Sequence, residues 1–187
     1  MRRFVIITVG KTHSGKTTFA RLLENKLEDT IVMDQDIHAE LINKYYKKLQ
    51  PKTGPNTLKH AISKLIVDYT VVNTNYHLII SNSNRSIHDR EYLLKELFPK
   101  DNFIRIIVHF NIPDHILLAR VENSNRNTNI FRGATSFKQV LTRQQEESNR
   151  DDIIDPTEME ADYLFVVKDG MEVEAVIGKI VRIANDS

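Results

Sequence analysis

The sequence contains no cysteine among its 187 residues. This absence excludes disulfide bonds, thiolate nucleophiles and zinc sites with cysteine ligands. Long apolar runs are missing as well, since no stretch approaches the roughly 18 apolar residues of a membrane-spanning helix. The apolar run at 4–9 follows two arginines but is too short for a secretory signal. We therefore expect a cytoplasmic protein that is not bound to a membrane.

An excess of charge of one sign is also lacking, with 26 basic and 25 acidic residues. The overall charge therefore provides no general attraction to nucleic acid or to acidic membranes. One local bias stands out in NKYYKKLQPK (43–52), where four lysines surround Tyr45 and Tyr46. This stretch is either a solvated helix end or a contact for nucleic acid, a partner that the overall charge does not favour.

Short apolar runs alternate with segments of helical periodicity along the chain. Near-continuous apolar runs are typical of strands that are buried on both faces of a parallel sheet. The alternation predicts an α/β fold, and the length predicts a single domain over 1–187. The runs expected as strands are 4–9, 30–33, 77–81, 103–110 and 163–167, and helical patterns cover 19–27, 56–69, 88–98, 112–123, 135–147 and 171–184.

A phosphate-binding motif lies between the first strand and the first helix. GKTHSGKT (10–17) matches the pattern G-x-x-x-x-G-K-[ST], and the alternative reading is an ordinary glycine turn. Backbone N–H groups of such a loop and the helix N-terminus hold polyphosphate, the lysine lies along the β- and γ-phosphates, and the following hydroxyl binds Mg²⁺. We expect ATP and Mg²⁺ as cofactors. The predicted contacts are Gly10, Lys11, Thr12, His13, Ser14, Gly15, Lys16, Thr17 and Thr18, with Thr17 as a metal ligand.

Three further stretches extend this pattern over nearly the whole chain. They are IVMDQDIHAEL (31–41), LIISNSNRSIHDRE (78–91) and VHFNIPDHILLARVENSNR (108–126). With them the chain resembles small P-loop kinases of the AAA-like and zeta-toxin-like groups, most closely the kinase domain of polynucleotide kinase. Shikimate, gluconate and adenylylsulfate kinases are more distant relatives. The resemblance implies a three-layer fold with a five-stranded parallel sheet in the order 2-3-1-4-5, an arginine lid at about 123–134 and an acceptor-binding region at about 37–76.

Two aspartates follow the second expected strand. Asp36 lies 20 residues after Lys16, and in polynucleotide kinase the aspartate at this interval is the catalytic base. The resemblance therefore implies that Asp36 orients the acceptor hydroxyl and takes its proton. Similarity to shikimate kinase implies that Asp34 holds Mg²⁺. The alternative for each aspartate is an N-cap of the following helix.

The chain departs from the polynucleotide kinase pattern after the third strand. An aspartate of that family is replaced by Asn82, which carries no negative charge. Asn84 and Arg85 then become candidate acceptor contacts or parts of a solvated loop, and His38 is a further candidate on the helix after Asp36. His13 stands where many small kinases have glycine, so it strains the backbone, contacts phosphate or faces solvent.

Arginines mark the expected lid. Related kinases close such a loop over ATP, and its arginines neutralise charge on the transferring phosphoryl group. Arg126 matches the lid arginine of polynucleotide kinase after a two-residue insertion, which makes it a catalytic candidate together with Lys16 and Asp36. Arg120 and Arg132 are candidate nucleotide contacts. The alternatives are a structural ion pair for Arg120 and a role in solubility for Arg126 and Arg132.

Three functions are compatible with these features. The first is an ATP-dependent kinase that phosphorylates a hydroxyl of a small metabolite, nucleoside or nucleotide, which the balanced charge and compact length favour. The second is a polynucleotide 5′-hydroxyl kinase, which the family resemblance and the stretch 43–52 favour. The third is a nucleotide-binding regulatory ATPase without an acceptor, which Asn82 in place of an acidic residue leaves open.

Overall fold

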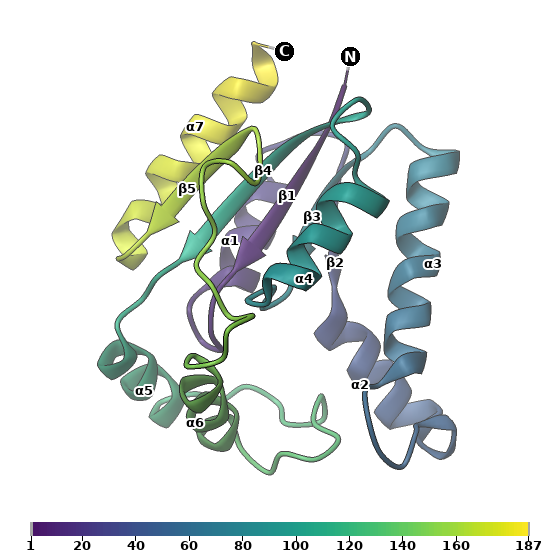
Figure 1. The fold of residues 1–187 in the computed structure, drawn as a ribbon, viewed down its shortest axis with the longest axis vertical. Coiled ribbons are helices and arrows are strands. Elements are labelled where there is room, and N and C mark those ends of the chain that lie inside the picture. Colours follow the sequence, from purple (N-terminus) through teal and green to yellow (C-terminus); the bar gives the residue numbers. More distant parts are fainter. Residues whose placement is uncertain (1, 187) are drawn as a thin grey trace.

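A five-stranded parallel sheet lies between two layers of helices in the computed structural model, which describes residues 2–186 (Figure 1). The order of the strands is β2-β3-β1-β4-β5, as predicted from the family resemblance. All five apolar runs expected as strands are confirmed. The strands are β1 (Arg3–Val9), β2 (Thr30–Asp34), β3 (His77–Ser81), β4 (Phe103–Phe110) and β5 (Tyr163–Val167).

The central strand β1 explains why the first apolar run is continuous. It pairs with β3 and β4, so that Ile6 lies opposite Ile79 and Ile106, and residues 4–7 are fully buried. Helices cover both faces, since α4 lies in front of the strands in Figure 1 and α1 lies behind them. The rear layer contains α1 (Lys16–Glu24) and α7 (Val173–Asn185), and the front layer contains α3 (Thr57–Asn73) and α4 (Ile87–Glu91). Two further helices, α5 (Asp114–Glu122) and α6 (Phe137–Glu147), lie beyond the end of the sheet.

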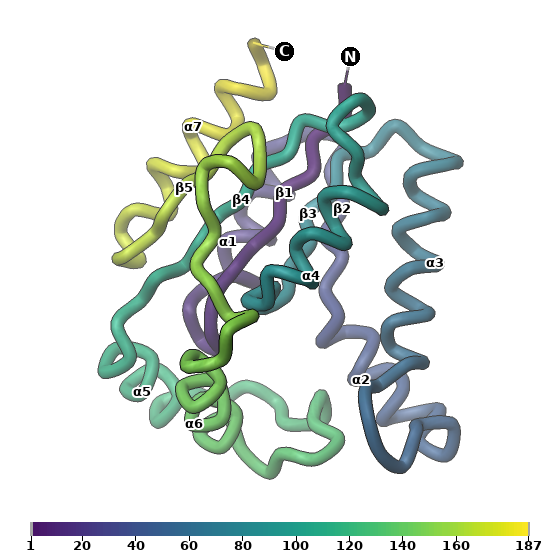
Figure 2. Tube along the Cα trace, viewed as in Figure 1, coloured from purple at the N-terminus to yellow at the C-terminus, as the bar shows by residue number. Residues whose placement is uncertain are grey.

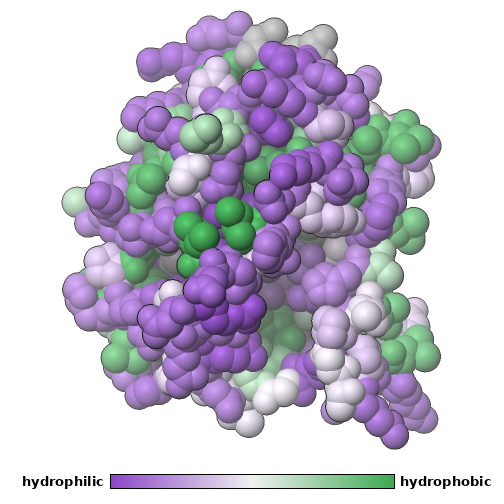
Figure 3. Space-filling model, viewed as in Figure 1, coloured by the Kyte–Doolittle hydropathy of each residue, from purple (hydrophilic) through white to green (hydrophobic). Residues whose placement is uncertain are grey.

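The helices agree with the sequence pattern except at 88–98. The pattern at 88–98 forms α4 and then a π-helical segment, η2 (Tyr92–Leu97). In α3 the buried face is Ser63, Val67 and Thr70, while Leu65 and Tyr69 are 68% and 64% exposed. Figure 3 shows apolar side chains along the edge of the molecule formed by α3. The remaining helical segments are α2 (Gln35–Tyr45), η1 (Lys47–Leu49) and η3 (Gly170–Glu172).

Among the helices of residues 2–186, none combines the length and the apolar character that crossing a bilayer requires.

The carboxyl ends of β1, β3 and β4 approach one another closely at Gly10. Its N–H donates to the Ser83 carbonyl at 2.9 Å, and its φ of 151° is rarely adopted by other residues. A Cβ at this position would lie 2.9 Å from the carbonyl oxygen of Phe110 and 2.9 Å from Ser14 Oγ. Glycine therefore allows the chain after β1 to turn into the phosphate loop between the two neighbouring strand ends.

A buried ion pair fixes the loop that follows β3. The Arg90 guanidinium is inaccessible to solvent and donates to both carboxylate oxygens of Glu160, at 2.7 and 3.1 Å. Its third nitrogen donates to the carbonyl oxygens of Asn84 and Arg85, at 3.3 and 2.9 Å. Arg90 thus connects the end of β3 to the segment that leads into β5.

We expect Arg90→Met to lower the free energy of unfolding by about 3 kcal/mol, because it leaves a largely buried carboxylate and two carbonyls without their donor. Urea unfolding followed by circular dichroism measures this change. The control is Arg21→Met, which removes an exposed ion pair with Glu24 and should change stability by less than about 0.5 kcal/mol. Equal effects of the two substitutions would contradict this account of Arg90.

Candidate active site

A cleft of about 650 Å³ lies at the carboxyl ends of the strands. Its walls come from the phosphate loop with the start of α1, from α2 and α3, from the loop between α5 and α6, and from α6 itself. Figure 2 shows the chain leaving α5, running as an open loop toward α2 and returning to α6. Ligands of open α/β sheets bind at this edge, so the cleft is the candidate active site.

The phosphate loop surrounds the ammonium group of Lys16. Lys16 Nζ donates to the Lys11 carbonyl at 2.5 Å and to Ser14 Oγ at 3.2 Å, and no carboxylate of residues 2–186 forms an ion pair with it. Burial lowers the pKa of Lys16 to about 8, although the negative charge of Asp36 opposes this shift. The loop therefore presents a desolvated cation at the position where the motif predicts phosphate.

The other members of the loop divide between the cleft and its supports. Thr12, Gly15, Thr17 and Thr18 line the cleft, and Gly15 begins α1 with a φ of 107°. The Lys11 ammonium is paired with Asp114 of α5 at 2.6 Å, so Lys11 contributes only its backbone to the loop.

His13 connects the phosphate loop to the start of the lid. Its φ of 58° is left-handed, a conformation that histidine adopts more often than most non-glycine residues. Its ring nitrogens lie 3.0 Å from Thr12 Oγ1 and 2.7 Å from Ser124 Oγ. Burial and the nearby cations Arg126 and Lys16 lower the pKa of His13 to about 4, so the ring is neutral at pH 7. Of the three expected roles, the structure disfavours a ring that simply faces solvent.

Oxygen ligands suitable for Mg²⁺ gather beside Thr17. Thr17 Oγ1 donates to Asp34 Oδ2 at 3.4 Å, and burial raises the pKa of Asp34. Ser81 lies opposite Asp34 in the sheet, and its buried Oγ has no hydrogen-bond partner among residues 2–186. Asp34 also accepts from the Asp36 N–H at 2.9 Å, so it is the N-cap of α2 as well. These groups fit Mg²⁺, which usually takes one or two carboxylates and completes its shell with water and substrate phosphates.

Residues 2–186 contain no group of three or more histidine or acidic side chains that could hold a metal ion by themselves.

The loop expected to form a lid (123–134) contacts Asp36 through Arg126. Arg126 NH2 lies 3.2 Å from Asp36 Oδ2, and its guanidinium stacks over the Phe137 ring at 4.9 Å from the centroid. Two further contacts tie this loop to α2 and to the segment that follows it. The Asn43 side chain donates to the Phe131 carbonyl at 3.2 Å and to that of Asn129, and Arg132 donates to the carbonyls of Pro51, at 3.2 Å, and Gly54.

Arg120 supports the phosphate loop from α5. Its guanidinium donates to the carbonyl oxygens of His13 and Ser14, at 3.2 and 3.3 Å. No carboxylate of residues 2–186 forms an ion pair with Arg120, which lines the cleft while these two carbonyls engage its guanidinium. Arg132 likewise lines the cleft while its guanidinium is engaged by backbone carbonyls.

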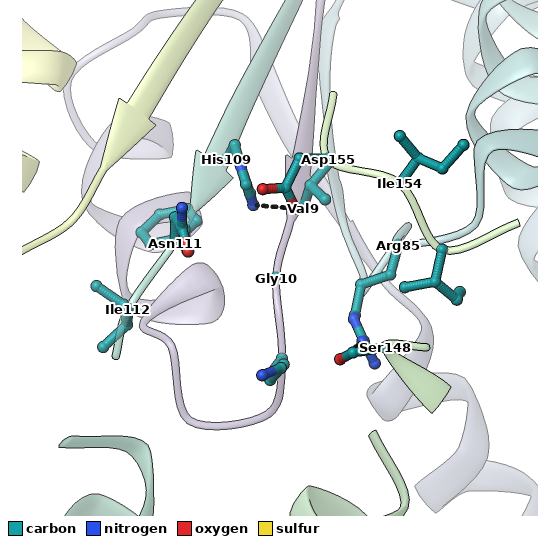
Figure 4. Close-up of a pocket in the computed structure, with 12 residues that line it drawn as sticks. Val9, Gly10, Arg85, His109, Asn111, Ile112, Ser148, Ile154 and Asp155 are labelled. Carbon is teal, nitrogen blue, oxygen red and sulfur yellow. Dashed lines mark hydrogen bonds and ion pairs between the residues drawn. The ribbon is translucent and has the colours of Figure 1, made fainter. Parts of the chain in front are cut away.

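Three of the four predicted acceptor contacts lie outside the cleft, and only Asp36 lines it. His38 is buried and bonded to Ser63 of α3 at 2.8 Å. Asn84 is buried with a φ of 43°, and its amide donates to the Thr8 carbonyl. Arg85 donates to Ser148 at 2.6 Å, and Figure 4 shows it directed toward Ser148 beside a separate pocket of about 150 Å³ that also holds His109 and Asp155.

Among the polar residues of the cleft that were not predicted from the sequence, three lie on α3 and α6. Gln144 of α6 accepts the Thr12 N–H at 2.7 Å, and Arg143 lines the cleft beside it while pairing with Glu147 at 3.6 Å. Lys59 lines the cleft from the first turn of α3. Their segments show only helical periodicity, and no spacing in them signals a site.

Comparison with known proteins agrees with this geometry. The sequence model of the family described as an AAA domain matches residues 5–147, which is more than half of the chain. The chain belongs to this AAA domain family. No curated protein matches the sequence.

Solved structures show the same fold at low identity. Shikimate kinase from Bacteroides thetaiotaomicron is 13% identical with a TM-score of 0.57, and the match covers 97% of this chain and 98% of that one. Gluconokinase from Sinorhizobium meliloti is 17% identical with a TM-score of 0.56, covering 98% of each chain. Kti12 from Chaetomium thermophilum, solved with ADP-AlF3, is 18% identical with a TM-score of 0.60, covering 94% and 96%.

The affinity for Mg-ATP is expected to fall as the pH rises above about 8, the pKa of Lys16 in the ligand-free protein. Phosphate oxygens favour the charged ammonium, so bound nucleotide raises this pKa, and binding above pH 8 requires the uptake of a proton. The Kd measured by calorimetry should therefore rise about fivefold between pH 8 and pH 9.

Lys16→Met should bind weakly without this pH dependence, and Lys26→Met, which alters an exposed lysine paired with Glu174, should retain it. A Kd that stays level up to about pH 10 in the unmodified protein would contradict the shift proposed for Lys16.

Proposed function

We propose that the protein is an ATP-dependent kinase that transfers the γ-phosphoryl group of Mg-ATP to a hydroxyl of a small-molecule acceptor. The proposal depends on one observation, which is that Lys16, Asp36 and Arg126 line the same cleft beside a complete phosphate loop. Membership of the AAA domain family and the kinase-like fold support it.

The donor side consists of the phosphate loop and Lys16. Backbone N–H groups and the N-terminus of α1 hold the phosphates, and the desolvated ammonium lies along the β- and γ-phosphates. Thr17 and Asp34 would hold Mg²⁺, which when bound neutralises charge on these phosphates. The preformed cation means that little rearrangement is required when nucleotide binds.

The acceptor side depends on Asp36. Its carboxylate accepts a hydrogen bond from the acceptor hydroxyl, orients the oxygen toward the γ-phosphorus and takes the proton. A bond forms between that oxygen and the phosphorus, the bond between the γ-phosphorus and the bridging oxygen breaks, and ADP leaves. Arg126 lies 3.2 Å from Asp36 and so reaches the place where negative charge develops on the transferring group.

A polynucleotide 5′-hydroxyl kinase is the second candidate, favoured by the surface around the end of α2. Tyr45, Tyr46 and Leu49 are exposed there among lysines, close in sequence to the wall of the cleft. Exposed aromatic rings interleaved with cations can stack on bases and neutralise phosphates. This candidate predicts an affinity that falls steeply with salt, whereas a small-molecule kinase predicts little change.

Asp36→Asn is expected to reduce acceptor-dependent release of ADP by about 100-fold or more, because the amide cannot accept the proton. The Kd for Mg-ATP should stay within about twofold, since the phosphate loop is unchanged. Coupled assays with sugars, hydroxy acids, nucleosides, nucleotides and a 5′-hydroxyl oligonucleotide provide the measurement. Glu40→Gln, one turn further along α2 and outside the cleft, is the matched control.

Slow ATP hydrolysis that responds to no acceptor and persists in Asp36→Asn would contradict the proposal. That result would instead support the third function considered above, a regulatory ATPase without an acceptor.

A further inference from the structure

The cleft contains six cationic side chains, and five of them are engaged by protein groups. Lys16 is held by the phosphate loop, Arg120 and Arg132 by backbone carbonyls, Arg126 by Asp36 and Arg143 by Glu147. The sixth is Lys59, whose ammonium forms no hydrogen bond or ion pair within residues 2–186.

Lys59 is placed in the half of the cleft formed by the acceptor-binding region. It lies in the first turn of α3, whose N-cap Asn56 also lines the cleft. Burial lowers the pKa of Lys59, and the charges of Asp36 and Asp34 only partly oppose the shift. A half-buried ammonium that no protein group neutralises would bind an anionic ligand favourably.

The nucleotide does not supply this anion in the proposed arrangement. The phosphate loop, Lys16 and the start of α1 account for the donor phosphates. Lys59 lies on α3, which packs against α2, the helix that carries Asp36, and both residues line the cleft. Asp36 would bind the acceptor hydroxyl. The N-terminal turn of α3 adds a partial positive charge that also favours an anion at this place.

We infer that Lys59 binds an anionic group of the acceptor, so that the substrate is a hydroxy compound carrying a carboxylate or a phosphate. The inference rests on the proposed function. A negative group at Lys59 would fix one end of the acceptor while its hydroxyl lies at Asp36. A neutral hydroxy compound would lack this anchor and leave the ammonium desolvated.

The test uses pairs of hydroxy compounds that differ in charge. Gluconate is compared with glucose, a hydroxy acid with its amide, and a nucleoside monophosphate with its nucleoside. For the preferred compound, kcat/KM should exceed that of its neutral partner by about 30-fold, the worth of one charge-assisted hydrogen bond. Lys59→Met should abolish this preference by raising the KM for the anionic acceptor, while the KM for ATP stays within about twofold. Lys59→Arg should restore part of the preference for the anionic acceptor.

The matched control is Lys64→Met, which alters a lysine of the same helix that is paired with Asp68 at 2.6 Å on the exposed surface. Thermal-shift measurements with Mg²⁺ and a non-hydrolysable ATP analogue repeat the comparison without turnover. Equal binding of both members of every pair would overturn the inference, as would a Lys59→Met variant that changes only the KM for ATP. Acceptor-dependent turnover with neutral compounds alone would overturn the inference but not the kinase, whereas hydrolysis indifferent to every compound would overturn the kinase itself.

Discussion

A desolvated ammonium without a carboxylate partner is the feature on which the cleft depends. Lys16 is held between a backbone carbonyl and a serine hydroxyl, neither of which carries a negative charge. The loop reaches this geometry because three of its residues, Gly10, His13 and Gly15, adopt positive φ values. The folded protein thus retains an uncompensated charge that an anionic ligand can satisfy, and polyphosphate is the anion that this loop geometry favours.

The other charges of the cleft are arranged around that cation. Asp34 and Asp36 follow β2, and the lid brings Arg126 against Asp36. Asn43 and Arg132 connect the loop 123–134 to α2 and the segment after it, so this contact is made through backbone carbonyls as well as through the ion pair. Lid closure in such a site excludes water and brings the cation to the reacting groups.

The sequence was sufficient to predict the strands and helices from apolar runs and periodicity, and the strand order from the family resemblance. It was insufficient for side-chain direction. Arg85 lies in the loop after β3, yet its side chain turns to Ser148 because a buried Arg90 fixes the backbone of that loop. Periodicity predicted a helix over 56–69 but not its buried face, since Leu65 is exposed because the helix packs through Ser63 and Val67. Lys59 and Arg143 enter the cleft through tertiary packing alone, which no spacing along the chain records.

The most direct test of the central claim is the fate of the γ-phosphoryl group. Phosphorus NMR of the protein with Mg-ATP and a mixture of hydroxy compounds distinguishes the two outcomes. The account predicts a new phosphomonoester resonance that grows in step with ADP. Growth of inorganic phosphate alone, at a rate independent of the added compounds, would contradict it.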